Sequence, residues 1–373
     1  MADIKIGGSN GEDGLSYIGV IDEIWISKDN KIRRSNGQTP GGVVISSAGG
    51  STTWDNLDDK DGAAGPSKIV IGLNAGGAGD KTIALGQQAG ATDQRARSIA
   101  IGDSAGETTQ STDSVAVGNV AGQTTQGGAA VAVGSEAGRT NQGDEAVAIG
   151  DQAGKTTQGN NATAVGNAAG SISQGQSAVA IGDTAGTTDQ SGSAIAIGSS
   201  AGMATQGTTA VAIGENAGQT TQGARAIAIG KDAGKTNQDG TSIAIGNLAG
   251  ETTQGYNSVA VGDSAGKTNQ NNNAVAIGRR AQLTGGGEYA VAIGINAGYE
   301  GQGESAVAIG HDAGQTNQHA NSIVINASGV ETNSTAASSL VIKPVRDVAG
   351  AGLPAGFKKV AYNPTTGEFI SYG

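Results

Sequence analysis

Few side chains in this 373-residue chain are suited to catalysis or metal binding. There is no cysteine, and the two histidines are His311 and His319. If three chains associated about one axis, each histidine would form a three-fold ring, and imidazole rings can bind transition metals. Both histidines fall in segments expected to face solvent, so they are weak candidates, and we expect no metal and no cofactor.

The carboxylates are also poorly placed for catalysis. Many follow a recurrent glycine, as Asp103, Asp151, Asp183 and Asp263 do. They are not paired at a spacing that suggests glycoside hydrolysis. A solvated charged edge that discourages aggregation explains them. We therefore expect no enzyme activity, and a glycan-degrading spike is the enzymatic alternative.

The composition excludes several classes of protein. The chain has 66 glycines, only 3% aromatic residues and a net charge of −11. So few large rings cannot fill a conventional globular core of this length. An acidic chain does not favour nucleic acid or anionic membrane surfaces as partners, and no apolar stretch is long enough to span a bilayer. The composition instead favours a thin, regular architecture.

A repeat of 16 residues explains the glycine content. It runs without insertion or deletion through most of the chain, and each copy has one glycine that ends a short apolar run, which we call the corner glycine. The corner glycines are Gly86, Gly102, Gly118, Gly134, Gly150, Gly166, Gly182, Gly198, Gly214, Gly230, Gly246, Gly262, Gly278, Gly294 and Gly310.

Each position of the repeat has a physical role. Val147 and Ile149 precede Gly150 with an alanine between them, a pattern of period two that predicts a short strand. The glycine allows a tight backbone corner. The polar run Thr156–Gln158 then predicts a second strand, and small or polar residues after it predict a second turn.

These elements predict an all-β solenoid of about seventeen coils with parallel strands, on the order of 80 Å long. Two branched aliphatic residues and an alanine or two would supply the burial in each coil. That burial is small against the conformational entropy of the ordered residues. We therefore expect several copies of the chain to associate along the rod.

A glutamine recurs eight residues after the corner glycine and predicts a ladder of amide hydrogen bonds, either inside the coil or between chains. A flat Thr-x-Gln face that binds a regular surface such as ice is the alternative. The glutamines are Gln94, Gln110, Gln126, Gln142, Gln158, Gln174, Gln190, Gln206, Gln222, Gln238, Gln254, Gln270, Gln302 and Gln318.

One copy departs from the pattern. After Gly278 come Arg279 and Arg280, and this copy lacks both the usual Ala-Gly pair and the glutamine, with Gly286 in the glutamine's position. Tyr289 and Tyr299 lie in this part of the chain. A tolerated sequence defect is one interpretation. A local binding site is the other, because arginine and aromatic residues are favoured in recognition patches.

The repeat resembles the head domain of YadA-type trimeric autotransporter adhesins. Ser114–Gly118, Ser258–Gly262 and Ala306–Gly310 match its S-V-A-I-G segment closely. The resemblance implies a left-handed parallel β-roll, a homotrimer and adhesion to host surfaces. The family's usual period is nearer 14 residues, and longer repeats look more like those of virus and phage fibres.

The two ends differ from the repeat and predict small β caps. Ala361–Tyr372 resembles the segment that precedes a self-cleaved trimerisation chaperone in many tail fibres, and Tyr362, Phe369 and Tyr372 are binding candidates there. Gly19–Ser27 resembles the last strand of a laminin-G-like jelly roll, whose members often bind glycans. We expect an N-terminal attachment region at 1–66, the roll at 67–326 and a C-terminal knob at 327–373.

The sequence therefore predicts a structural, adhesive protein: a homotrimeric fibre on the surface of a virus or phage particle that attaches to a host. Its partners would be itself, other virion components at one end, and a host receptor or glycan at the other, without nucleic acid or membrane insertion. The alternative is the head fragment of a bacterial surface adhesin.

Overall fold

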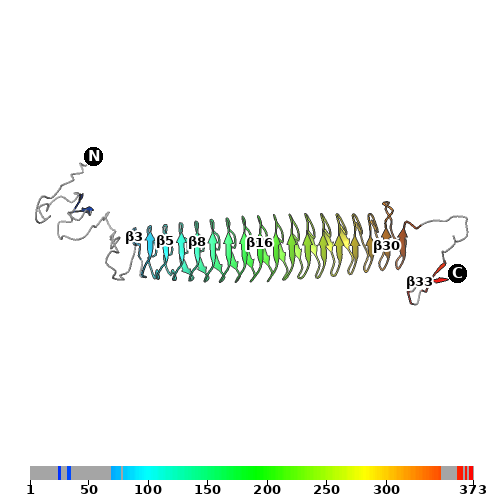
Figure 1. Ribbon diagram of the computed structural model, residues 1–373, viewed down its shortest axis with the longest axis horizontal. Helices are drawn as coiled ribbons and strands as arrows, with labels where there is room; N and C mark the ends of the chain where they lie inside the picture. Colours follow the sequence, from blue (N-terminus) through cyan, green and yellow to red (C-terminus); the bar gives the residue numbers. More distant parts are fainter. Residues whose placement is uncertain are drawn as a thin grey trace, which may run out of the picture.

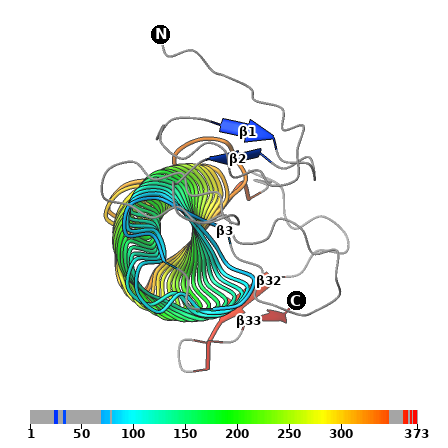
Figure 2. The ribbon, with the colours of Figure 1, turned by 90° about the vertical axis from the view of Figure 1, so that its left-hand side faces the viewer.

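The computed structural model describes residues 24–26, 32–34, 69–76, 79–345, 359–363, 366–367 and 369–372. All regular structure in these ranges is β, and they contain no helix. Between Ile69 and Lys343 the chain winds into a straight solenoid whose coils stack one on the next (Figure 1). Figure 2, a view along the solenoid, shows the coils superimposed as a flattened ring. The expected parallel β-solenoid of about seventeen coils is confirmed.

The apolar runs form one continuous parallel sheet, which we call the aliphatic sheet. Its strands pair in register, so that Val147 lies beside Val131 on one side and Thr163 on the other. In chain order the strands are β3 (Ile69–Ile71), β4 (Ile83–Leu85), β5 (Ile99–Ile101), β6 (Val115–Val117), β8 (Val131–Val133), β10 (Val147–Ile149), β12 (Thr163–Val165), β14 (Val179–Ile181), β16 (Ile195–Ile197), β18 (Val211–Ile213), β20 (Ile227–Ile229), β22 (Ile243–Ile245), β24 (Val259–Val261), β26 (Val275–Ile277), β28 (Val291–Ile293), β29 (Val307–Ile309), β30 (Ile323–Asn326) and β31 (Leu340–Lys343).

The polar runs form a second parallel sheet of 11 strands, the Thr-x-Gln sheet, on the other side of the coil. Isolated bridges such as Gln94 to Gln110 and Glu300 to Thr316 extend it at both ends. Its strands are β7 (Thr124–Gln126), β9 (Thr140–Gln142), β11 (Thr156–Gln158), β13 (Ile172–Gln174), β15 (Thr188–Gln190), β17 (Ala204–Gln206), β19 (Thr220–Gln222), β21 (Thr236–Gln238), β23 (Thr252–Gln254), β25 (Thr268–Gln270) and β27 (Thr284–Gly286).

Two turns join the sheets. The first turn begins at the corner glycine and leads into the Thr-x-Gln sheet. The second turn consists of the residues after the glutamine and leads back to the aliphatic sheet. The middle residue of a Thr-x-Gln strand has a left-handed backbone, as at Thr157 (φ 55°). It makes no ladder pair, whereas Thr156 and Gln158 pair with Ile172 and Gln174 of the next coil.

The roll continues past the boundary at residue 326 that the sequence suggested. Strand β31 pairs in parallel with β30, with Ile325 beside Ile342. The last coil therefore has one residue more than the 16-residue coils before it, so it does not follow the fixed period of the sequence. Most of the predicted N-terminal region at 1–66 lies outside the described residues. Its strands β1 (Ile24–Ile26) and β2 (Ile32–Arg34) form an antiparallel pair, and the laminin-G-like interpretation stays a prediction.

The corner glycines have the conformation that the sequence predicted. Gly150 has φ +131°, which other residues rarely adopt. A Cβ atom there would also overlap the carbonyl oxygen of Gly166, the corner glycine of the next coil. Glycine is therefore required twice, once for the backbone conformation and once for the close stacking of successive corners.

We expect Gly150→Val to destabilise the roll by at least about 1–3 kcal/mol, because valine adds backbone strain and displaces the next corner. Asp151→Asn is the matched control. The Asp151 side chain is exposed and accepts one hydrogen bond of 3.4 Å, from Asn167, so the thermal midpoint of this variant should stay close to that of the unchanged chain. Thermal unfolding followed by circular dichroism measures both variants. An unchanged midpoint for Gly150→Val would contradict the tight corner.

Candidate functional site

The interior of the roll is built from alanine and glutamine. In a typical coil Ala148, Ala153 and Gln158 are buried, with 0%, 0% and 2% exposure, and the hydrophobic core consists of alanines apart from Val324. The branched residues point outward, and Ile149 is 41% exposed. The expectation that valine and isoleucine supply the burial within each coil is therefore wrong, because the alanine between them faces inward instead.

The glutamines form the predicted amide ladder, and it lies inside the coil. The Nε2 atom of Gln158 donates to Oε1 of Gln174 in the next coil (3.0 Å) and to the carbonyl oxygen of Val147 (2.9 Å). The same pair of bonds recurs along the roll from Gln110. The ladder therefore joins each coil to the next and also joins the two sheets of one coil.

The irregular coil after Gly278 keeps the ladder intact. Gln282, four residues after the corner glycine, is fully buried and takes the place of the missing glutamine. It accepts a hydrogen bond from Gln270 (3.2 Å) and donates one to Gln302 (2.7 Å). Gly286 leaves the room for it, because a Cβ atom there would overlap the Gln282 side chain. Glycine and glutamine have exchanged positions, so this coil is not a defect in the core.

The outer face of the aliphatic sheet is an apolar stripe that runs the length of the roll. The valine and isoleucine side chains on either side of each inward alanine are half-buried or exposed. Because the strands are stacked in register, these side chains form two columns, and only Thr163 interrupts one of them with a hydroxyl. Soluble monomers rarely expose a contiguous apolar surface of more than a few hundred Å², and larger patches mark interaction sites.

The first turn carries charged side chains that pair between neighbouring coils. Lys155 lies 2.7 Å from Glu136, and Arg139 lies 3.0 Å from the same carboxylate. The hydrogen bond from Lys155 holds the pKa of Glu136 below its ordinary value, and Arg139 acts in the same direction. These contacts tie coils together at the surface. Asp103, Asp151, Asp183 and Asp263 are exposed on the same turn, as expected.

The structure separates the residues proposed as a local binding site. Arg279 and Arg280 are exposed on a first turn, whereas Tyr289 is exposed on a second turn, at the opposite edge of the aliphatic sheet. Tyr299 is half-buried and precedes the Thr-x-Gln sheet one coil further on. A hydrogen bond to Glu288 raises the pKa of Tyr289. A single compact patch is therefore not formed within one chain.

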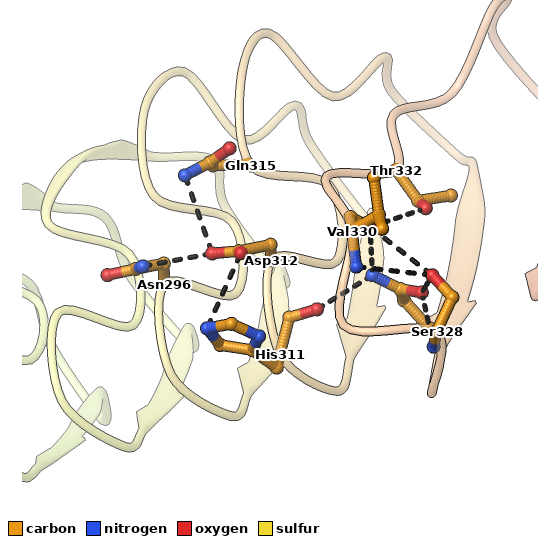
Figure 3. A network of polar contacts seen from close by, with 8 residues as sticks. Asn296, His311, Asp312, Gln315, Ser328, Val330 and Thr332 are labelled. Carbon is orange, nitrogen blue, oxygen red and sulfur yellow. Dashed lines mark hydrogen bonds and ion pairs between the residues drawn. The ribbon is translucent and has the colours of Figure 1, made fainter.

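The histidines lie on different turns of the last regular coil. Figure 3 shows His311 beside Asp312, with His311 Nε2 3.4 Å from the carboxylate, which also accepts a hydrogen bond from Asn296 (2.9 Å). His319 contacts the hydroxyl of Ser334, 3.1 Å from its Nδ1 atom. Within the described ranges, no group of three or more histidine, aspartate or glutamate side chains is placed to hold a metal ion.

Asn326 ends the row of corner glycines. Its side-chain amide donates to the carbonyl oxygens of His311 (2.7 Å) and Val330 (2.8 Å). Ser328 donates back to its side-chain oxygen, and Thr332 also donates to Val330, as Figure 3 shows for the labelled residues. This network closes the last turn, where the coil becomes longer.

At the C-terminal end, β32 (Lys359–Tyr362) and β33 (Phe369–Tyr372) form an antiparallel pair. Tyr362 and Phe369 lie opposite each other with ring centroids 5.1 Å apart, and both are more than half exposed. The side chain of Tyr372 lies outside what the structure describes. An exposed aromatic pair is typical of surfaces that bind a partner.

In comparisons with known proteins, no family model and no curated protein matches the chain. Among the residues that the structure describes, no helix is long and apolar enough to cross a membrane.

The exchanged glycine and glutamine can be tested as a pair. Gln282→Gly should leave a cavity and cost about 1–3 kcal/mol, because its buried amide partners lose their hydrogen bonds. Gly286→Gln should destabilise the coil by overpacking it with a second amide side chain. The double variant restores the usual order and should unfold close to the unchanged chain. If the double variant lost as much stability as the two single variants together, the two positions would not share one space in the interior.

Proposed function

We propose that this chain is the shaft of a homotrimeric fibre that attaches a virus or phage particle to a host surface. The observation that supports this most strongly is the apolar stripe on the aliphatic sheet. Alanine and glutamine fill the coil, so the branched side chains have no partner within the chain. Burying them against further copies is the natural way to stabilise such a rod.

The trimer, rather than another number of chains, follows from the resemblance to YadA-type heads. The same resemblance supports a left-handed roll. In this arrangement the three stripes face a common axis, and the Thr-x-Gln sheets face outward. The outward surface is then small, polar and repetitive, which suits a spacer better than a receptor site.

The ends are the proposed contact regions. The exposed pair of Tyr362 and Phe369 supports a C-terminal tip that binds a host receptor or glycan, with the other end attached to virion components. A head fragment of a bacterial surface adhesin is the alternative. A glycan-degrading spike is a further alternative, and incubation with capsular polysaccharide would detect it.

Charges placed in the stripe should prevent trimer formation. We expect Ile213→Lys with Ile229→Lys to convert trimers into monomers or aggregates, because three pairs of lysines would be forced together at the axis. The matched control is Thr220→Lys with Thr236→Lys, which adds the same charge on the Thr-x-Gln face of nearby coils. Sedimentation equilibrium measures the mass of each variant. A stable monomer of the unchanged chain at micromolar concentration would overturn the proposed architecture.

Removal of residues 346–373 separates the shaft from the tip. This variant keeps β31, so the roll ends at its last strand. We expect it to lose adhesion to a panel of bacterial strains that the labelled full chain binds. Tyr362→Ala with Phe369→Ala should cause the same loss without removing the segment. If the shortened chain adheres as strongly as the full chain, the shaft carries the contact and the tip does not.

A further inference from the structure

The cations of the roll point to a specific contact between chains. From residue 82 to residue 339 there are ten lysines and arginines, and seven form an ion pair within the chain. In this fully described part of the chain, the three without an ion pair are Arg225, Arg279 and Arg280. All three are exposed.

These three arginines border the apolar stripe. We call the residues one and two positions after each corner glycine the first flank, and those ten and eleven positions after it the second flank. The two flanks lie at opposite edges of the aliphatic sheet, because each turn joins that sheet at one end of its strands. Arg279 and Arg280 belong to the first flank, and Arg225 belongs to the second.

Each unpaired arginine has a carboxylate on the other flank at the same level of the rod. Glu288 lies on the second flank of the coil of Arg279 and Arg280, and Glu304 lies one coil further, about 4.8 Å along the rod. Glu215 lies on the first flank of the coil of Arg225. The stripe separates these opposite charges within one chain, and no ion pair joins them in this part of the structure.

Rotation of a second copy about an axis beside the stripe would bring them together. In a parallel arrangement with rotational symmetry, the first flank of each chain meets the second flank of its neighbour, and equal residue numbers lie at equal height. We propose that Arg279 and Arg280 of one chain form ion pairs with Glu288 and Glu304 of the adjacent copy, and that this contact fixes the register of the chains. The inference rests on the proposed trimer and specifies its interface.

The other levels of the rod are compatible with this pairing. In the proposed arrangement, Glu136 on the first flank of one chain would face Asp144 and Glu145 on the second flank of its neighbour, which places like charges together. Glu136 is already paired with Arg139 and Lys155 of its own chain, so its charge is compensated. Asp113 is compensated in the same way by Arg97. Many of the remaining levels carry uncharged side chains on one flank or both.

Cross-linking tests the contact directly, because the natural chain has no cysteine. Arg279→Cys with Glu288→Cys, treated with a short bifunctional maleimide, should give covalent dimers and closed trimers on a denaturing gel. Each single variant should remain monomeric on the gel. The matched control is Arg279→Cys with Thr252→Cys, which moves the second cysteine to the exposed Thr-x-Gln face and should also give no covalent trimer.

Charge exchange gives an independent readout. Arg279→Glu with Arg280→Glu should raise the dissociation constant of the trimer roughly tenfold or more at low salt, and Glu288→Arg with Glu304→Arg should do the same. All four changes together should return the dissociation constant to that of the unchanged chain. High salt should reduce the differences in dissociation constant between the variants.

The outcomes separate this inference from the function on which it rests. If the unchanged chain forms a trimer but the cysteine pair cross-links no more than its control, or the fourfold exchange fails to restore association, the proposed ion pairs are wrong while the fibre stands. If the unchanged chain is monomeric, both proposals fail. Covalent trimers together with rescue by charge exchange support the contact.

Discussion

From Gln110 to Gln302, each buried glutamine of the ladder donates a hydrogen bond to the glutamine of the next coil, and the other features of the roll depend on this bond. The amide requires a small interior, so the neighbouring inward residues are alanine and glycine. The bond also requires a constant spacing between successive coils, and the close stacking of the corner glycines allows this spacing. Where the glutamine moves to position 282, Gly286 replaces it on the opposite wall, so the interior volume is conserved although the order of residues is not.

The period and the chemistry of its positions could be predicted from the sequence. Gly150 predicted a tight corner because only glycine tolerates its backbone conformation, and the recurrent glutamine predicted an amide ladder because equal residues stack in a parallel solenoid. Which side of the aliphatic strand faces the interior could not be derived from the sequence. The pattern Val147, Ala148, Ile149 is compatible with either the branched residues or the alanine pointing inward. Hydrophobicity favoured the larger side chains for the core, whereas the volume left by the glutamine admits only alanine.

The location of the ladder depended on a conformation that residue types alone did not reveal. In a regular strand Thr156 and Gln158 would share one face. The left-handed residue Thr157 between them reverses this relation, so Thr156 is exposed and Gln158 is buried. A β-branched residue resists that conformation, and asparagine, which tolerates it better, occupies the same position at Asn141 and Asn237. Because threonine and asparagine both occur at this middle position, its left-handed conformation could not be recognised from the residue types.

The small interior also determines where this molecule can interact. A core of alanine buries little area per residue, so the free energy that holds a coil in place must come from hydrogen bonds and from surfaces outside it. The aliphatic sheet offers such a surface, and it is apolar in nearly every coil, so in the proposed trimer it would attract other copies without fixing their register. In the proposed trimer, charges at the edges of the sheet would supply the register, since opposite charges on the two flanks occur at only a few heights along the rod. A long repetitive interface therefore depends on its few irregular coils for specificity, and the coil of Arg279 and Arg280 is irregular in its surface charges and in its core.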